Sequence, residues 1–162
     1  MARDSSWLSA VPLALARAAT AVACASLIGM ALVEGWQVFA RYVLNDSPSW
    51  TEPVALLLMS AAMMCGAAVG VRADAHFGFF LAVHLMPARL RRAVQVVGRL
   101  VVIAIGAVLA YWGGVLLADG WSVPMAGAPL PQGLVFLPIC VGGALIALFA
   151  VERLLVPDEP GR

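Results

Sequence analysis

The chain has 162 residues, of which 63% are hydrophobic and 12% charged, and its formal net charge at pH 7 is +1. A soluble protein of this length cannot bury so much apolar surface, so lipid must form part of its solvent. The small net charge provides no electrostatic field that would attract nucleic acid. The three cysteines lie far apart in apolar runs and lack metal-ligand spacing, which excludes a disulfide framework.

The first apolar run, residues 18–40, is long enough to cross about 30 Å of hydrocarbon and predicts a membrane span. Residues 21–24 loosely match a lipoprotein cleavage box, but the nearby charge of Arg17 favours an uncleaved span. Near the end of this run three polar residues, spaced three and four apart, share one helix face: Glu34, Gln37 and Arg41. Polar groups at that depth require partners.

Residues 54–71 predict the second span. Ser49 and Glu52 fit the S-x-x-E pattern of a capping box, and Trp50 fits the interfacial aromatic belt. Because the loop between the two spans is short, we expect Arg41 and Glu52 to lie at similar depth, where they could pair. Two interpretations follow, namely a capped helix with an interfacial ion pair, or a polar cluster that binds another subunit.

The segment 76–87, after the second span, mixes aromatic and aliphatic residues with His76 and His84 and is too short to span a membrane. We expect a short amphipathic helix in the membrane interface. Three arginines follow it and would contact anionic lipid headgroups: Arg89, Arg91 and Arg92. Both histidines fall in this one segment, outside the spans, so we predict neither a haem nor a metal cofactor.

Two further runs, residues 100–117 and 134–151, complete four predicted spans. Backbone groups in lipid must be satisfied within each segment, so the predicted fold is an all-α integral membrane protein forming a single domain over residues 1–162. The span centres hold no Asp, Glu, Lys, Arg or His, which argues against a self-sufficient ion-coupled carrier. No nucleophile and base are paired in the sequence, and we expect no enzyme activity.

The arginines predict the orientation. Five of them lie between the second and third predicted spans, from Arg72 to Arg99, whereas the connection after the third span carries only Asp119. We therefore expect the middle segment and both termini to be cytoplasmic. Arg41 is the exception, because it falls on the outer side.

Several short motifs occur in a fixed order around these spans: Gln37-Val38-Phe39-Ala40-Arg41-Tyr42, Trp50-Thr51-Glu52, Arg72-Ala73-Asp74-Ala75-His76 and Pro87 with its arginines. In this order the chain resembles the DctQ-type small membrane subunit of TRAP (tripartite ATP-independent periplasmic) transporters.

The resemblance implies a bacterial inner-membrane location and two partners, a large sodium-coupled membrane subunit and a periplasmic binding protein that delivers an organic acid such as a C4-dicarboxylate. It implies a non-catalytic scaffold that holds the large subunit and helps to dock the binding protein. The residues we single out for an interface or structural role are Glu34, Gln37, Arg41, Trp50, Glu52, Arg72 and His76.

Two other classes of function stay open at this point. An oligomer of the chain could form a self-sufficient carrier or channel, for which the polar residues available are Glu34 and Gln37. A membrane enzyme or haem–quinone protein would show a Soret absorbance band. Flux through the purified, reconstituted chain distinguishes the first of these from a transporter subunit.

Overall fold

The structure, a computed structural model, describes residues 5–73 and 88–155. It contains four long helices and one 3-10 turn: α1 (Ser5–Val43), α2 (Thr51–Arg72), α4 (Ala88–Asp119), η1 (Gln132–Phe136) and α5 (Leu137–Leu155). Each of the four long helical segments is long and apolar enough to cross a membrane, so the prediction of four spans is confirmed. The predicted interfacial segment, 76–87, lies outside the described residues.

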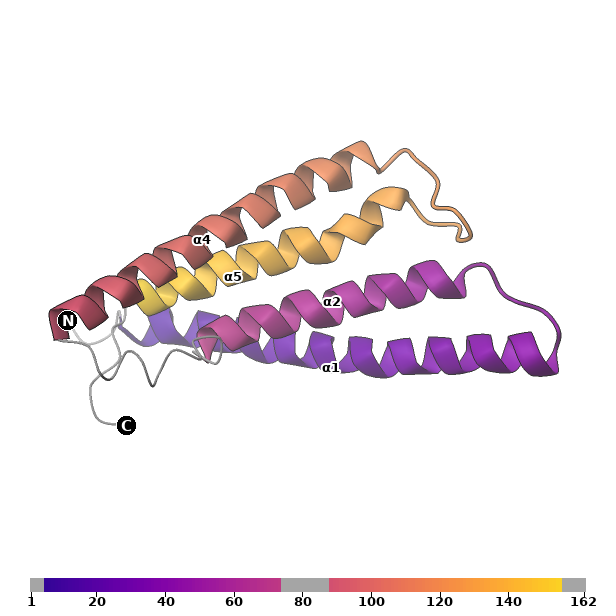
Figure 1. Ribbon diagram of the computed structural model, residues 1–162, viewed down its shortest axis with the longest axis horizontal. Coiled ribbons are helices and arrows are strands. Elements are labelled where there is room, and N and C mark those ends of the chain that lie inside the picture. The colour runs from indigo at the N-terminus through magenta and orange to yellow at the C-terminus, as the bar shows by residue number, and fades with distance from the viewer. Residues whose placement is uncertain (1–4, 74–87, 156–162) are drawn as a thin grey trace.

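The helices pack as an open row and not as a closed bundle. The main contacts join α1 to α2, α2 to α5, and α5 to α4 (Figure 1). Both α1–α2 and α4–α5 are antiparallel hairpins, and α2 and α5 run parallel to each other in the middle of the row. The outer helices α1 and α4 therefore each keep one face that no other described helix covers.

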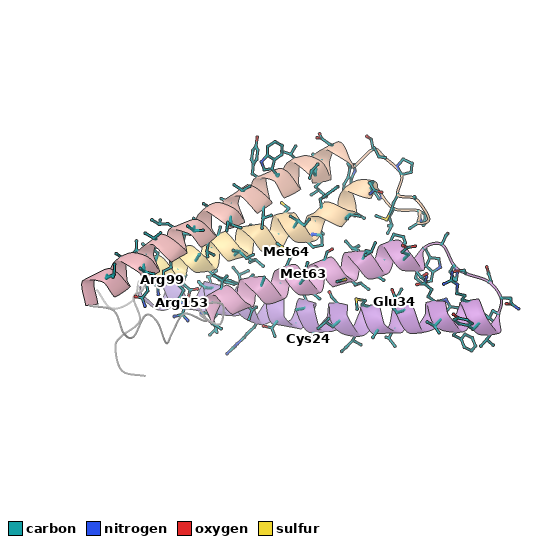
Figure 2. The ribbon with its side chains drawn as sticks, viewed as in Figure 1. Cys24, Glu34, Met63, Met64, Arg99 and Arg153 are labelled. Carbon is teal, nitrogen blue, oxygen red and sulfur yellow. The ribbon has the colours of Figure 1, made fainter. Side chains whose placement is uncertain are left out.

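The two ends of the row differ in character. We call the end with residues 44–50 and 120–131 the connection end, because the α1–α2 and α4–α5 loops lie there (Figure 1). The opposite end holds Arg99 and Arg153 (Figure 2) together with Arg72, the last residue of α2, and we call it the arginine end.

Glycine allows α4 and α5 to approach each other closely. A Cβ atom on Gly106 would lie 2.7 Å from the backbone nitrogen of Ala147, and one on Gly113 would lie 2.7 Å from that of Cys140. These two glycines are seven residues apart, so they recur on the same face of α4. Lipid tails are as apolar as the helix side chains, so the hydrophobic effect does not drive two helices together in a membrane. Close backbone contact stabilises the helix pair instead.

A small apolar cluster fills the junction of α1, α2 and α5 near the arginine end. Phe149 is fully buried there against Ala16, Ala68 and Ile146. The two alanines leave room for the ring, and the ring in turn fills the space that their small side chains would leave empty. The two hairpins are thus held together by packing at this level.

The helix ends correct several details of the sequence prediction. α1 is longer than residues 18–40 at both ends, and Asn45, in the left-handed region with φ 54°, follows its last turn. The predicted capping box is wrong, because Trp50 occupies the N-cap of α2 and no side chain caps it. Pro138 lies in the first turn of α5, where its missing N–H costs no helical hydrogen bond.

Candidate functional site

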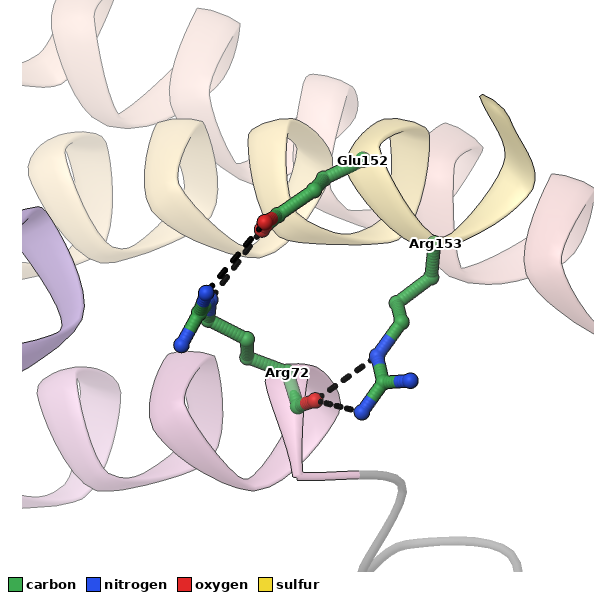
Figure 3. A network of polar contacts seen from close by, with 3 residues as sticks. All are labelled: Arg72, Glu152 and Arg153. Atoms are coloured by element: carbon green, nitrogen blue, oxygen red, sulfur yellow. Dashed lines mark hydrogen bonds and ion pairs between the residues drawn. The ribbon is translucent and has the colours of Figure 1, made fainter. Parts of the chain in front are cut away.

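A bidentate ion pair joins α2 to α5 at the arginine end. Arg72 Nε lies 3.1 Å from Glu152 Oε2, and Arg72 Nη2 donates to Glu152 Oε1 at 3.3 Å (Figure 3). The two side chains are only 25% and 16% exposed. The guanidinium carbon of Arg72 also lies 6.0 Å from the centroid of the Phe149 ring, so the ion pair continues directly into the apolar cluster.

Two further arginines bind the backbone at helix C-termini. Arg153 Nε donates to the carbonyl oxygen of Arg72 at 2.8 Å, and its Nη2 donates to the same oxygen (Figure 3). Arg99 Nη1, from α4, donates to the carbonyl oxygen of Arg153 at 2.6 Å. Cations are favourable at helix C-termini, where carbonyl groups lack partners in the helix. This network of Arg72, Arg99, Glu152 and Arg153 therefore ties three helices together.

The arginine end was only partly predicted. Arg72 was singled out for an interface or structural role, and the structure places its side chain in an ion pair within the chain. No role was predicted for Glu152. The sequence could have indicated such a role, because an acidic residue at the end of the fourth span lies on the same side of the membrane as an arginine at the end of the second span. His76 lies outside the described residues, and the three predicted lipid-binding arginines, Arg89, Arg91 and Arg92, fall in the first turns of α4.

At the connection end, the two loops meet. The Ser49 hydroxyl donates to the carbonyl oxygen of Gly127 at 3.0 Å. Gly127 adopts φ +84°, and a Cβ atom there would lie 2.5 Å from the Ser49 carbonyl oxygen. The Thr51 hydroxyl, fully buried, donates to the Pro48 carbonyl oxygen at 2.8 Å. The loop of residues 120–131 thus closes over the start of α2 and links the two hairpins a second time.

We expect Gly127→Ala to open this contact between the two loops. The added methyl group would meet the Ser49 backbone in a left-handed conformation that alanine adopts at a cost of about 1–2 kcal/mol. Limited proteolysis in detergent should then cut residues 120–131 several-fold faster than in the wild type. The neighbouring exposed Ala126→Gly serves as the control, and equal cleavage rates for Gly127→Ala and the wild type would contradict the assigned contact.

The predicted polar cluster lies at the same end. Glu34, Arg41, Trp50 and Glu52 are exposed, and Gln37 is half-buried; Figure 2 shows Glu34 on α1. Within residues 5–73 and 88–155, no salt bridge joins Arg41 to Glu52, and the ion pair found is the one between Arg72 and Glu152. The interpretation as an interfacial ion pair within the chain is therefore wrong for these two residues.

Charged residues are absent from the middle of each predicted span. Four stretches, 18–33, 53–71, 100–118 and 132–151, carry no Asp, Glu, Lys, Arg or His. Among the described residues there is no group of three His, Cys, Asp or Glu side chains that could hold a metal ion. The charged side chains therefore gather at the two ends of the row: Arg72, Arg99, Glu152 and Arg153 join helices at the arginine end, and Glu34, Arg41 and Glu52 are exposed at the connection end.

A family model described as the DctQ component of tripartite ATP-independent periplasmic transporters matches residues 30–158. That match covers most of the chain, from the last turns of α1 to beyond α5. No curated protein matches the chain.

Proposed function

Because the chain belongs to the DctQ family of tripartite transporter components, we propose that it is the small, non-catalytic membrane subunit of a sodium-coupled transporter for organic acids. It is a multi-pass inner-membrane protein. Its partners in this proposal are a large membrane subunit, which moves the substrate and the sodium ions, and a periplasmic binding protein. The C4-dicarboxylates and related carboxylates are the proposed substrate class.

One observation supports a non-transporting subunit over a self-sufficient carrier. The charged residues are confined to the ends of an open row of helices. A carrier needs polar groups near the middle of the membrane to bind ions and substrate. The four charge-free stretches offer no Asp, Glu, Lys, Arg or His for this purpose. An open row, on the other hand, leaves broad helix faces available for a second membrane protein, as a scaffold requires.

We place the arginine end in the cytoplasm and the connection end in the periplasm. The excess of arginines at one end supports this orientation. Both termini would then be cytoplasmic. The connection end would face the binding protein, and the cluster of Glu34, Gln37, Arg41, Trp50 and Glu52 would bind a partner subunit there.

The test is a pull-down of the tagged chain in mild detergent from its native membrane, followed by mass spectrometry. We expect recovery of a large polytopic membrane protein encoded by the same organism. Recovery of the chain alone as a homo-oligomer, with ion or carboxylate flux after reconstitution, would contradict the proposal and favour a self-sufficient carrier or channel.

A charge reversal at Arg41 tests the role of the polar cluster. We expect Arg41→Glu to reduce recovery of the large subunit about tenfold, which corresponds to about 1.4 kcal/mol of binding free energy, while Arg41→Lys keeps most of it. Because Arg41 and Glu52 do not pair with each other in the structure, the double variant Arg41→Glu/Glu52→Arg should not restore recovery. Full restoration by the double variant would show that the two charges do pair in the complex.

A further inference from the structure

The contact between Gly29 and Leu58 fixes the level of α1 relative to α2. A Cβ atom on Gly29 would lie 3.3 Å from the Leu58 side chain. From that level Arg17 lies 12 residues along α1 and Arg72 lies 14 residues along α2, both toward the arginine end, which corresponds to about 18 Å and 21 Å at 1.5 Å per residue. Toward the connection end α1 continues for 14 residues and α2 for only seven. The two arginines therefore lie at almost the same level on neighbouring helices.

The apolar cluster at the junction of α1, α2 and α5 gives the same result independently. Ala16, which immediately precedes Arg17, is 7% exposed and belongs to the cluster that contains Phe149. The guanidinium carbon of Arg72 lies 6.0 Å from the centroid of the Phe149 ring. Arg17 and Arg72 thus flank one apolar cluster, the first from α1 and the second from α2.

The level of these two arginines is that of the phospholipid headgroups. The charge-free stretch of α1 begins at residue 18 and that of α2 ends at residue 71, so each arginine is the first charged residue outside its span. α2 has 22 residues and is about 33 Å long, close to the hydrocarbon thickness of about 30 Å. Its last residue, Arg72, therefore reaches the layer of the lipid phosphate groups, and Arg17 reaches the same layer from α1.

Arg72 keeps hydrogen-bond donors after it has paired with Glu152. Its Nε and Nη2 atoms donate to the two carboxylate oxygens, whereas no residue within 5–73 and 88–155 accepts a hydrogen bond from Nη1. Figure 3 shows Nη1 directed away from Glu152. A guanidinium carries five N–H donors in one plane, so the donors that remain can bind a second anion. Glu152 therefore fixes the position of Arg72 without using all of its donors.

Arg17 supplies a second positive charge at this level. Its side chain is exposed, and the described part of the chain provides no ion-pair partner for it. Glu152 is the acidic side chain that the described residues place at this end of α5, and it is already bound to Arg72. Because the dielectric constant is lower at the edge of the hydrocarbon than in bulk water, an anion beside these cations is attracted more strongly there. The two arginines therefore favour an anionic ligand.

We propose that Arg17 and Arg72 together bind the phosphate group of an anionic glycerophospholipid, with Glu152 orienting Arg72 so that its Nη1 atom donates to a phosphate oxygen. Arginine suits this ligand because its planar N–H donors match the oxygen atoms of a phosphate and the hydrogen bonds are charge-assisted. An anionic lipid fits better than a zwitterionic one, because it brings no ammonium group near the two cations. The inference goes beyond the proposed function and depends only on the location of the chain in a membrane.

The test is a titration of the purified, delipidated full chain in detergent with phosphatidylglycerol. Bound lipid is counted by native mass spectrometry, and stability is followed by thermal unfolding. We expect phosphatidylglycerol to raise the melting temperature by about 4 °C at saturation and phosphatidylcholine to raise it by less than about 1 °C. Equal shifts with the two lipids would overturn the proposed anionic ligand, and the same shift with inorganic phosphate alone would overturn the assignment to a lipid.

Arg17→Gln tests the contribution of α1. The side chain is exposed, so the variant should melt like the wild type before lipid is added. We expect its apparent Kd for phosphatidylglycerol to rise about tenfold, the usual effect of losing a hydrogen bond between charged groups. Arg41→Gln removes the same charge at the connection end and is the matched control, which should bind the lipid as tightly as the wild type. Unchanged affinity of Arg17→Gln would overturn the proposal.

The double variant Arg72→Gln/Glu152→Gln tests the contribution of α2. It removes both charges of the ion pair, so neither charge stays partly buried without its partner. Its melting temperature without lipid shows whether it folds, and its apparent Kd for phosphatidylglycerol should rise about tenfold. If the folded double variant binds phosphatidylglycerol as tightly as the wild type, Arg72 does not contact the phosphate and the shared site is wrong.

Discussion

Replacing Gly113 with alanine is expected to destabilise the folded chain by about 1–3 kcal/mol, the usual cost of forcing extra atoms into a packed interior. The added Cβ would lie 2.7 Å from the backbone nitrogen of Cys140 and 2.9 Å from its Cα atom. These are backbone atoms, so relief requires α4 and α5 to move apart along their length. Gly106→Ala should act in the same way, because its Cβ would meet the backbone of Ala147.

Gly66→Ala on α2 is the matched control. No heavy atom lies within 4 Å of the position that its Cβ would take, and alanine is the better helix former. The measurement is thermal unfolding in detergent, followed by circular dichroism. We expect lower melting temperatures for Gly113→Ala and Gly106→Ala and no decrease for Gly66→Ala. Equal melting temperatures for all three variants would show that α4 and α5 are not in close backbone contact.

Hydropathy and length were sufficient to predict the four spans, because a helix is the only open-chain structure that satisfies its backbone in lipid. They could not predict where α1 ends. Nothing in the composition of residues 35–43 distinguishes a helix that stays within the membrane from one that projects beyond its neighbour. That difference depends on the level at which Gly29 meets Leu58, which is a tertiary contact.

The prediction of the polar contacts failed for a related reason. Sequence proximity suggested that Arg41 and Glu52 would pair across a short loop, but α1 overshoots the start of α2 and no salt bridge joins them in the described part of the chain. The ion pair that does form joins Arg72 to Glu152, 80 residues apart. Orientation alone places these two at the same side of the membrane, yet their contact also requires α2 and α5 to be neighbours in the row.

The two hairpins are linked at both ends of the row, and these links oppose hinge motion between them. Its two hairpins are linked at the connection end by Ser49 and Gly127 and at the arginine end by Arg72 and Glu152, with close helix packing between these levels. The proposed role as a scaffold for a transport subunit would require the chain to resist hinge motion between its two halves. Links at both ends oppose such motion better than one link of the same strength in the middle.

The link at the arginine end should be the more sensitive of the two to a single change. Glu152→Gln removes the charge that balances Arg72 while keeping the size of the side chain. The guanidinium would then stay largely buried beside Phe149 without its anion. Glutamine still offers Arg72 one amide oxygen, so the variant loses the charge and one of the two acceptors. Hydrogen bonds to charged groups contribute about 1.5–3 kcal/mol, and partial exposure of both side chains places our expectation at the lower end of that range.

We expect the melting temperature in detergent to fall for Glu152→Gln and to recover in part when the pair is exchanged, as in Arg72→Glu/Glu152→Arg. The exchange restores the opposite charges but not the position of the guanidinium over the Phe149 ring, so recovery should be incomplete. Arg17→Gln, at an exposed arginine of α1, is the control and should change stability little. If Glu152→Gln melts like the wild type, the network does not hold α2 against α5, and the packing around Phe149 alone accounts for their contact.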